Sequence, residues 1–523
     1  MFVYTKVQNP EKTPPAPLLS GRHGPPLRIF SHYLTFQSMK LQNYLLLSLL
    51  LTQTATAQLP PALSAIRNTD IRADIYAMAA DHFRGREAGT VDELKAAAWL
   101  AEKAKAAGLR PGGDDGTWFQ YFPMWRNRIS AFSTVTIDDH TFPLWTDVLI
   151  PQTASATVNA PILFIDKADT NRTDIKGKAI ALLASTEGLN LQVSLPLRRY
   201  PALLTRKYAA GLLAKGAAAV IFIADSLAEA GWSLNASYFD HGAYALEGDP
   251  AEKVVERAPV LWLHGAAADM LKAPGHTLKV QLTVEHFEYP SVNVIGIAPG
   301  KDPILSKEYV VFSGHHDHDG IRHASAPDSI FNGADDNASV SVALLAIARA
   351  FHQQPGRRSA LFIWHGAEER GLLGSRWFAA HPTVPKSSLV AVLNGDMIGR
   401  NSPDSAALLG VLPPHRNSSD LVAIGLAANK QGPHFLLDTT YDSPTHIEGW
   451  YFRSDHLPYA RAGIPSLFFT SLLHPDYHTP RDEASRIDTQ KITRIAQWMY
   501  LTGWKLANNN ARPAADPDFK LER

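Results

Sequence analysis

The sequence contains no cysteine among its 523 residues. Disulfides, thiolate-bound metals, iron–sulfur clusters and cysteine nucleophiles are therefore excluded. Any bound metal must be held by histidines, carboxylates or carbonyls, and the chain has 21 histidines and 50 acidic residues. A surplus of charge is also absent, because 50 Lys and Arg residues balance the acidic ones. This balance argues against a general nucleic-acid binder, which usually carries a basic excess.

A hydrophobic run of transmembrane length is missing too, since residues 44–51 fall short of the roughly 20 that a membrane helix needs. Met39 and a lysine precede this run, and an Ala-Thr-Ala segment ends at Ala57, as in a signal peptide with its cleavage site. A buried core helix is the alternative interpretation. We predict a signal peptide over residues 39–57, translation from Met39, export to the periplasm or the medium, and no membrane span in the mature protein.

The composition is that of a folded globular protein, with 45% hydrophobic and 19% charged residues. A chain of this length buries a large core without disulfides. The residue composition and the hydrophobic pattern change along the chain, and these changes predict five segments. They are an N-terminal extension with the signal peptide (1–57), a helical part of the main domain (58–129), a β-rich segment called the insert below (130–285), the rest of the main domain (286–508) and a flexible tail (509–523).

The first two folded segments differ in their local patterns. Thr90 and Glu93 form a capping box, because Glu93 can reach back to the amide of Thr90. Small and apolar residues follow at helical spacing, and Gly108 ends this helix in a left-handed conformation. The insert instead shows short β-rich runs between Gly, Pro and Asp turns, with one helical stretch at about residues 203–215.

From residue 291 onward, buried strands alternate with helices. The expected strands are Val292–Ala298, Tyr309–Phe312, Ala360–Trp364, Leu389–Asn394 and Pro465–Phe469. The helix expected at Ser339–Phe351 is apolar on nearly every face and should be buried. Apolar runs with intervening helices predict an α/β fold, a three-layer α/β/α sandwich around a mainly parallel, mixed sheet.

Polar groups follow the ends of these strands, where α/β folds place their ligand sites. They lie at residues 314–318, 332–339, 366–371, 394–397 and 474–482. Each group alone has an ordinary explanation, such as a helix N-cap or a solvated glutamate pair. Five groups at the ends of one sheet would bring carboxylates together, and a cation is the simplest way to hold them. Histidine and carboxylate ligands without sulfur suit Zn²⁺, and other divalent metals remain open.

The same groups resemble the motif series of the M28 family of zinc peptidases. The motifs are His315-x-Asp317, Gly333-Ala-Asp-Asp336-Asn-Ala-Ser339, Glu368-Glu369-Arg-Gly-Leu-Leu-Gly-Ser375, Asn394-Gly-Asp396-Met-Ile-Gly399 and Tyr477-His478-Thr-Pro-x-Asp482. Residues 81–90 and 454–465 are similar to further stretches of the family, and the insert is similar to a protease-associated (PA) domain. The resemblance covers residues 62–505 and implies the zinc exopeptidase fold.

The resemblance implies two Zn²⁺ ions per chain. His315 and Asp396 would bind one ion, and Glu369 and His478 would bind the other. Asp336 would bridge both ions, and its peptide bond to the next residue is expected to be cis, as in the family.

The remaining roles also follow from the resemblance. Glu368 would be the general base that activates a metal-bridged water, Asp317 would orient His315, and Tyr477 is a candidate to stabilise the oxyanion. His316 stands where relatives often have Tyr, and we predict that it faces the substrate cleft. The other histidines of these loops are taken as structural or pocket-lining: His318, His323, His365, His456 and His474.

The function implied is that of an exported metallo-exopeptidase, an aminopeptidase acting on peptides with a free N-terminus. A related carboxypeptidase or dipeptidase shares the same metal core and stays open. A glutaminyl cyclase keeps one zinc and does not need the first histidine ligand, so the presence of His315 argues against it. A receptor-like relative that only binds partners would have lost ligands or the base, whereas Glu368 and the ligand set are present.

Overall fold

The computed structural model describes residues 61–166, 169, 172–322 and 328–521. The signal peptide, the start at Met39 and the role of His323 concern positions outside these residues, so all three stay predictions. No helix in the described part of the chain is both long enough and apolar enough to cross a membrane.

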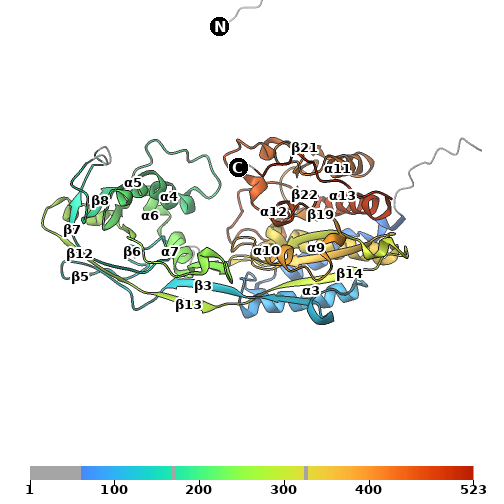
Figure 1. Cartoon of the computed structure of the whole chain (residues 1–523), viewed down its shortest axis with the longest axis horizontal. Helices are drawn as coiled ribbons and strands as arrows, with labels where there is room; N and C mark the ends of the chain where they lie inside the picture. The colour runs from blue at the N-terminus through green and yellow to red at the C-terminus, as the bar shows by residue number, and fades with distance from the viewer. Residues whose placement is uncertain (1–60, 167–168, 170–171, 323–327, 522–523) are drawn as a thin grey trace, which may run out of the picture. The chain divides into compact units, whose positions relative to one another are not determined.

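Within the described residues, nine strands form one mixed sheet in the main domain (Figure 1). Its order is β1 (Arg110–Pro111), β14 (Ser291–Ala298), β18 (Ser359–His365), β15 (Tyr309–His315), β19 (Leu389–Gly395), β22 (Ser466–Thr470), β20 (Ser405–Leu409) and β21 (Leu436–Leu437), and β2 (Phe119–Phe122) also pairs with β14. The four central strands β18, β15, β19 and β22 are parallel, whereas β14 and β20 join them antiparallel. The predicted α/β fold with a mainly parallel, mixed sheet is confirmed.

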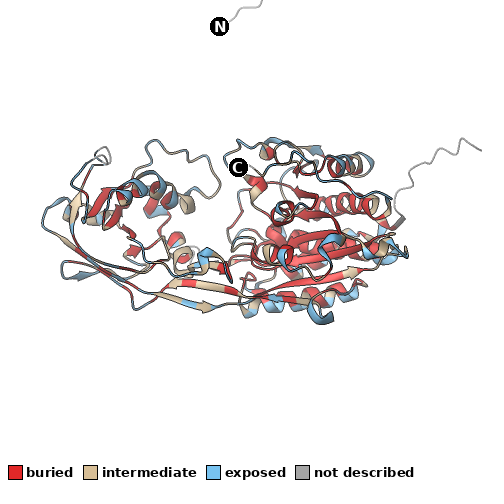
Figure 2. Cartoon of the chain, viewed as in Figure 1, coloured by how far each residue is buried: buried red, intermediate tan, exposed pale blue. Residues whose placement is uncertain are grey.

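Helices cover both faces of this sheet, which explains why its strands are apolar along their whole length. One face packs on α2 (Asn68–Met78), α3 (Val91–Ala106), α9 (Ser339–Gln353), α11 (Ser419–Gln431) and α13 (Thr489–Asn508). The other face packs on α10 (Leu373–Ala380) and α12 (His456–Arg461). Successive residues of β15 show the alternation, since Phe312 joins the first core and Val311 joins the second. Figure 2 shows the central strands and α9 as buried.

The capping box at the start of α3 forms with one difference. The Thr90 hydroxyl accepts hydrogen bonds from the amides of Asp92 and Glu93, as predicted. The Glu93 carboxylate accepts from the amide of Gly89 at 2.6 Å rather than from that of Thr90. Its other oxygen accepts from the Ser291 hydroxyl, so this buried glutamate ties α3 to the first residue of β14.

The insert has its own sheet and its own apolar cores. The described residues form an eight-stranded sheet in the order β5 (His140–Thr141), β4 (Thr134–Ile137), β12 (Thr277–Leu282), β7 (Ala156–Phe164), β8 (Ala179–Leu183), β9 (Ala219–Ile223), β11 (Val260–Leu263) and β6 (Val148–Leu149). Its helices are α4 (Pro196–Leu204), α5 (Ala210–Ala214), α6 (Ser226–Ala230), α7 (Trp232–His241) and α8 (Ala268–Lys272). The insert is therefore richer in helix than the β-rich pattern indicates.

Two antiparallel strands connect the insert to the main domain (Figure 1). They are β3 (Met124–Ile129) and β13 (Val284–Glu288), and β10 (Ala243–Leu246) pairs with β3 on its other side. A short hairpin of β16 (Gly320–Ile321) and β17 (Ile330–Phe331) lies in the main domain. The domain boundaries at 130 and 285, and the likeness of the insert to a PA domain, stay predictions.

The tail predicted as flexible makes defined contacts over its described residues. The Asp516 carboxylate accepts from the amide and the hydroxyl of Ser419 at 2.8 and 2.7 Å, at the first residue of α11. Arg512 forms an ion pair with Glu308 at 2.9 Å. At these positions the tail is packed against the main domain.

We predict that Phe312→Ala lowers the free energy of unfolding by about 3–5 kcal/mol, as expected for a large-to-small change in a close-packed core. Phe312 is fully buried in the middle of β15, stacks on Phe362 at 5.2 Å and meets the edge of Phe351 at 5.4 Å. Urea denaturation measures the loss. The control Ile304→Ala, at a side chain that is 76% exposed, should change stability by less than about 0.5 kcal/mol. An equal loss of unfolding free energy in the two variants would contradict the placement of Phe312 in the core.

Candidate metal centre

The four parallel central strands bring the predicted site residues to one edge of the sheet. Each lies at or just after the carboxyl end of a strand, or at the start of the buried helix: His315 ends β15, Glu368 and Glu369 follow β18, Asp396 follows β19, His478 lies in the loop after β22, and Asp336 lies in the distorted turn Ala334–Ala338 before α9. Because β18, β15, β19 and β22 are neighbours, residues that are far apart in sequence meet here.

Three carboxylates surround the imidazole of His315. Its Nε2 lies 3.2 Å from Asp336, 3.6 Å from Asp396 and 3.8 Å from Glu368. The imidazole is fully buried, yet Nε2 has no well-oriented hydrogen-bond partner among the described residues. The ligand atoms of His315, Glu368 and Asp396 are close enough together to bind one cation.

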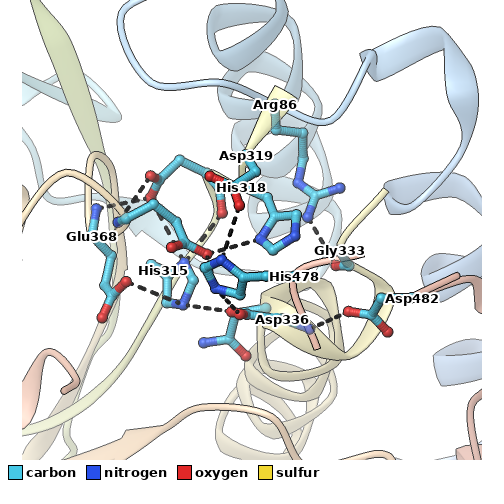
Figure 3. A network of polar contacts seen from close by, with 12 residues as sticks. Arg86, His315, His318, Asp319, Gly333, Asp336, Glu368, His478 and Asp482 are labelled. Carbon is cyan, nitrogen blue, oxygen red and sulfur yellow. Dashed lines mark hydrogen bonds and ion pairs between the residues drawn. The ribbon is translucent and has the colours of Figure 1, made fainter. Parts of the chain in front are cut away.

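A second group forms around His478. Its Nε2 lies 3.1 Å from Oδ2 of Asp336 and 3.2 Å from Oε1 of Glu369. Nδ1 of His318 lies 2.9 Å from the same glutamate oxygen. Asp336 therefore directs Oδ1 to His315 and Oδ2 to His478, and dashed lines in Figure 3 join it to both imidazoles. A carboxylate in this position can bridge two cations.

The backbone holds Asp336 in place. Its peptide bond to Asn337 is cis, as the sequence predicts. The buried Asp482 carboxylate accepts hydrogen bonds from the amides of Asp335 and Asp336, both at 3.0 Å (Figure 3). Asp335 in turn accepts from the amide of Gly399 in the loop after β19.

The electrostatics of the two groups favour a positive charge. Burial lowers the pKa of His315, but the carboxylates of Glu368 and Asp396 outweigh it and hold this pKa well above its usual value. Burial raises the pKa of Asp336, but the imidazoles of His315 and His478, 3.2 and 3.1 Å from its two oxygens, outweigh it and hold this pKa well below its usual value. The unpartnered Nε2 of His315 and a donor set of nitrogen and oxygen fit Zn²⁺.

The structure places Asp317 differently from its predicted role. Its carboxylate accepts from the amides of Glu368 and Glu369, at 3.0 and 3.3 Å. Nδ1 of His315 lies 3.2 Å from the Asp317 carbonyl and 3.7 Å from the carboxylate. Asp317 thus fixes the loop that carries the two glutamates, while its carbonyl orients the imidazole.

Tyr477 lies at the wall of a cavity of about 610 Å³ that Glu368 and Glu369 also line. The tyrosine hydroxyl accepts a hydrogen bond from Arg453 at 2.8 Å. Burial raises the pKa of Tyr477 to about 12, so the hydroxyl keeps its proton. Because Arg453 only donates, that proton is free to point to an oxygen in the cavity.

The prediction that His316 faces the substrate cleft is wrong. Its side chain is fully buried, and Nε2 lies 3.9 Å from the Glu93 carboxylate behind the sheet edge. His365 lies between Asn293 and Tyr459, in the structural role expected for it. The remaining assigned loop histidines are buried as well, His456 against Phe468 and His474 beside Asp335.

The sequence reasoning missed residues that contact the two groups. Asp319 lies 2.9 Å from Nδ1 of His478, and His318 joins Glu369. Both belong to the polar run after β15, which is the signal that could have found them. Arg198 in α4 and Tyr238 in α7 reach the site from the insert, contacting His478 and Asp319. No motif marks these two.

An α/β sandwich with this donor set at the ends of its parallel strands could bind divalent cations at that edge of the sheet. Residues 293–502 match the model of peptidase family M28. Aminopeptidase YwaD of Bacillus subtilis is 28% identical over 230 residues, covering 43% of this chain and 46% of that protein. A probable leucine aminopeptidase of Arthroderma otae is 28% identical over 239 residues, covering 43% and 60%.

Solved structures agree over a longer stretch. BSAP, a zinc aminopeptidase from Bacillus subtilis, superposes with a TM-score of 0.55 at 20% identity, covering 87% of this chain and 99% of that one. An aminopeptidase from Aneurinibacillus sp. strain AM-1 gives a TM-score of 0.54 at 18% identity, covering 87% and 97%. These likenesses show the fold. The chain spans only about half the length of the curated relatives that it matches.

We predict that Asp319→Ala weakens metal binding at the His478 group by about 10- to 100-fold, the usual effect of removing a carboxylate that orients a histidine ligand. The Asp319 carboxylate lies 2.9 Å from Nδ1 of His478 and is the acceptor that would keep Nε2 directed at the cation. Competition with a coloured chelator measures the affinity, and circular dichroism checks the fold. Asp404→Ala, in an exposed ion pair with Arg494, is the control. Unchanged affinity in a folded Asp319→Ala protein would disprove the role.

Proposed function

We propose that the chain is an exported aminopeptidase that removes N-terminal residues from peptides and holds two Zn²⁺ ions. The observation that supports this most directly is Asp336, whose two oxygens face the imidazoles of two separate donor groups. His315 and Asp396 would hold one ion, and Glu369 and His478 the other. His318, beside Glu369, extends the second group.

Glu368 is the proposed general base. Its carboxylate lies 3.8 Å from Nε2 of His315 and lines the cavity of about 610 Å³. Asp317 fixes its amide, so the carboxylate of Glu368 and that of Glu369 diverge from one anchored backbone. Glu368 takes a proton from the attacking water and passes it to the leaving amine.

The pair of cations, when bound, supplies the Lewis acidity that polarises the attacking water and the scissile carbonyl. The residues of the chain do the rest. Tyr477 donates its hydroxyl proton toward the oxygen on which negative charge develops, and Arg453 holds that hydroxyl in place. The insert residues Leu195 and Arg198 form part of the opposite wall of the cavity.

The choice among exopeptidases rests on the relatives. Several of them are called aminopeptidases, and one of these is described as a zinc enzyme. A carboxypeptidase or dipeptidase built on the same centre is the alternative. Aminoacyl chromogenic substrates with a free amine, tested beside their N-acetylated forms, separate these activities. Turnover of the N-acetylated forms alone would overturn the aminopeptidase proposal.

We predict that Glu368→Gln retains the fold and bound metal but loses about 10²- to 10⁴-fold in kcat, the usual contribution of a general base. The amide has nearly the shape of the carboxylate but cannot accept the proton. Steady-state kinetics on a leucine chromogenic substrate, with metal analysis of the same sample, measure both properties. The control is Glu288→Gln at an exposed position of β13. Turnover like that of the wild type in metal-loaded Glu368→Gln protein would refute the assignment.

We predict two metal ions per chain, and one fewer in His315→Ala. Without a cation, His315 and Asp396 would place a buried imidazole and a buried carboxylate at 3.6 Å with no further use, which is costly. The His478 group should keep its ion, because Glu369 and Asp336 remain. Elemental analysis of purified protein gives the count. A single ion with full activity, together with cyclisation of N-terminal glutamine, would favour the glutaminyl cyclase alternative.

A further inference from the structure

Three guanidinium groups line the cavity beside the metal centre. Arg198 and Arg199 come from α4 of the insert, and Arg453 follows the short turn Trp450–Phe452 of the main domain. The same cavity, of about 610 Å³, is lined by Glu368, Glu369 and His478. One side of it thus carries the proposed catalytic groups, and another carries a concentration of positive charge.

Arg198 is the arginine nearest to the centre. Its guanidinium lies 3.1 Å from Nδ1 of His478 and stacks 3.7 Å over the ring of Tyr238. No carboxylate of the described residues lies within the 4 Å of an ion pair with it, although the side chain is partly buried. A buried cation without a carboxylate partner is costly unless a ligand supplies one.

The contact with His478 is shared with a carboxylate. A guanidinium has only donors, so Nδ1 of His478 would have to accept from Arg198. The same nitrogen lies 2.9 Å from the Asp319 carboxylate, so Arg198 and Asp319 compete for it. Arg198 also lines the cavity, where a ligand can reach it.

The other two arginines share one carboxylate. Glu448 forms ion pairs with Arg199 at 3.0 Å and with Arg453 at 2.8 Å, and it also accepts from the Ser194 hydroxyl. Burial lowers the pKa of Arg199, and the charge of Arg453 lowers it further. This side of the cavity therefore has more cations than it can pair.

We propose that Arg198, supported by Arg199, binds a carboxylate of the substrate on the leaving-group side of the scissile bond, so that short peptides with a free C-terminus are preferred. This inference rests on the proposed aminopeptidase function. Each residue of an extended peptide spans about 3.3–3.6 Å. Because Arg198 contacts the ligand residue His478, a carboxylate one or two residues beyond the scissile carbonyl comes within its reach, and arginine binds carboxylates through two parallel hydrogen bonds.

Two kinds of substrate could supply this carboxylate: the C-terminus of a di- or tripeptide, or an acidic second side chain in a longer peptide. The dipeptide Leu-Ala, its amide Leu-Ala-NH₂ and the amide Leu-Asp-NH₂ separate them. Wild-type enzyme should have a kcat/KM for Leu-Ala at least about tenfold above that for Leu-Ala-NH₂. A preference for Leu-Asp-NH₂ over Leu-Ala would support the carboxylate site and identify the side chain as its source.

The variant Arg198→Met removes the charge and keeps much of the apolar stem. It should lower kcat/KM for Leu-Ala by about 10- to 100-fold, as expected for charge-assisted hydrogen bonds, and bring the ratio of Leu-Ala to Leu-Ala-NH₂ close to one. Arg198→Lys should restore part of the ratio. Arg206→Met, at an exposed position of the next helical segment, is the matched control and should leave the ratio at its wild-type value.

A binding measurement separates recognition from chemistry. Calorimetry with the reduced-bond analogue of Leu-Ala and with its amide should show a Kd difference in wild type that disappears in Arg198→Met, at unchanged metal content. Equal use of Leu-Ala, Leu-Ala-NH₂ and Leu-Asp-NH₂ by wild type, or an equal loss on all three in Arg198→Met, would overturn the carboxylate site while the proposed function stands. If wild type hydrolyses none of the free-amine peptides, the proposed function itself fails.

Discussion

The structure depends on one electrostatic constraint, the burial of several carboxylates and imidazoles at the ends of four parallel strands. Asp336 lies 3.2 Å from one imidazole and 3.1 Å from the other, and Asp396, Glu368 and Glu369 lie around the same two rings. Buried charges of one sign cost several kcal/mol each unless they are paired. Bound cations would remove that cost. The same close approach of carboxylates that destabilises the fold without metal therefore makes the cluster suitable as a metal centre.

Much of the surrounding structure holds this cluster in place. Arg86 is fully buried and donates from its three guanidinium nitrogens to the carbonyls of Met78, His316, Asn332 and Gly333, which joins α2 to two of the site loops. Three non-glycine residues in the left-handed region, Ala367, Met397 and His478, stand at or next to site residues. Such conformations cost about 1–3 kcal/mol each. The main domain tolerates this because its large core supports both faces of the sheet.

Local patterns in the sequence were enough to predict the central strands, the buried helix and the polar groups at the strand ends. Each of these signals lies within about ten consecutive residues, as in the run from His315 to Asp319. These local patterns do not predict contacts between segments that are far apart in the sequence. His316 lies near Glu93 because helix α3 packs against β14, the neighbour of β18, and Asp317 turns to the amides of Glu368 and Glu369 because β18 is the neighbour of β15. The sequence around His316 and Asp317 does not indicate either of these contacts.

The insert also contributes residues to the site that local sequence patterns do not reveal. Its sequence around Arg198 carries no motif, yet the fold brings that guanidinium to 3.1 Å from His478 and the Tyr238 hydroxyl to the carboxylate of Asp319. Both contacts converge on a single imidazole, since Asp319 accepts from its Nδ1. The negative centre lies in the main domain, whereas two of the three arginines that face it belong to the insert. Under the proposed function, the arginines of the insert would bind the C-terminal end of a short zwitterionic peptide and the main domain its N-terminal end, so both domains would contribute to recognition.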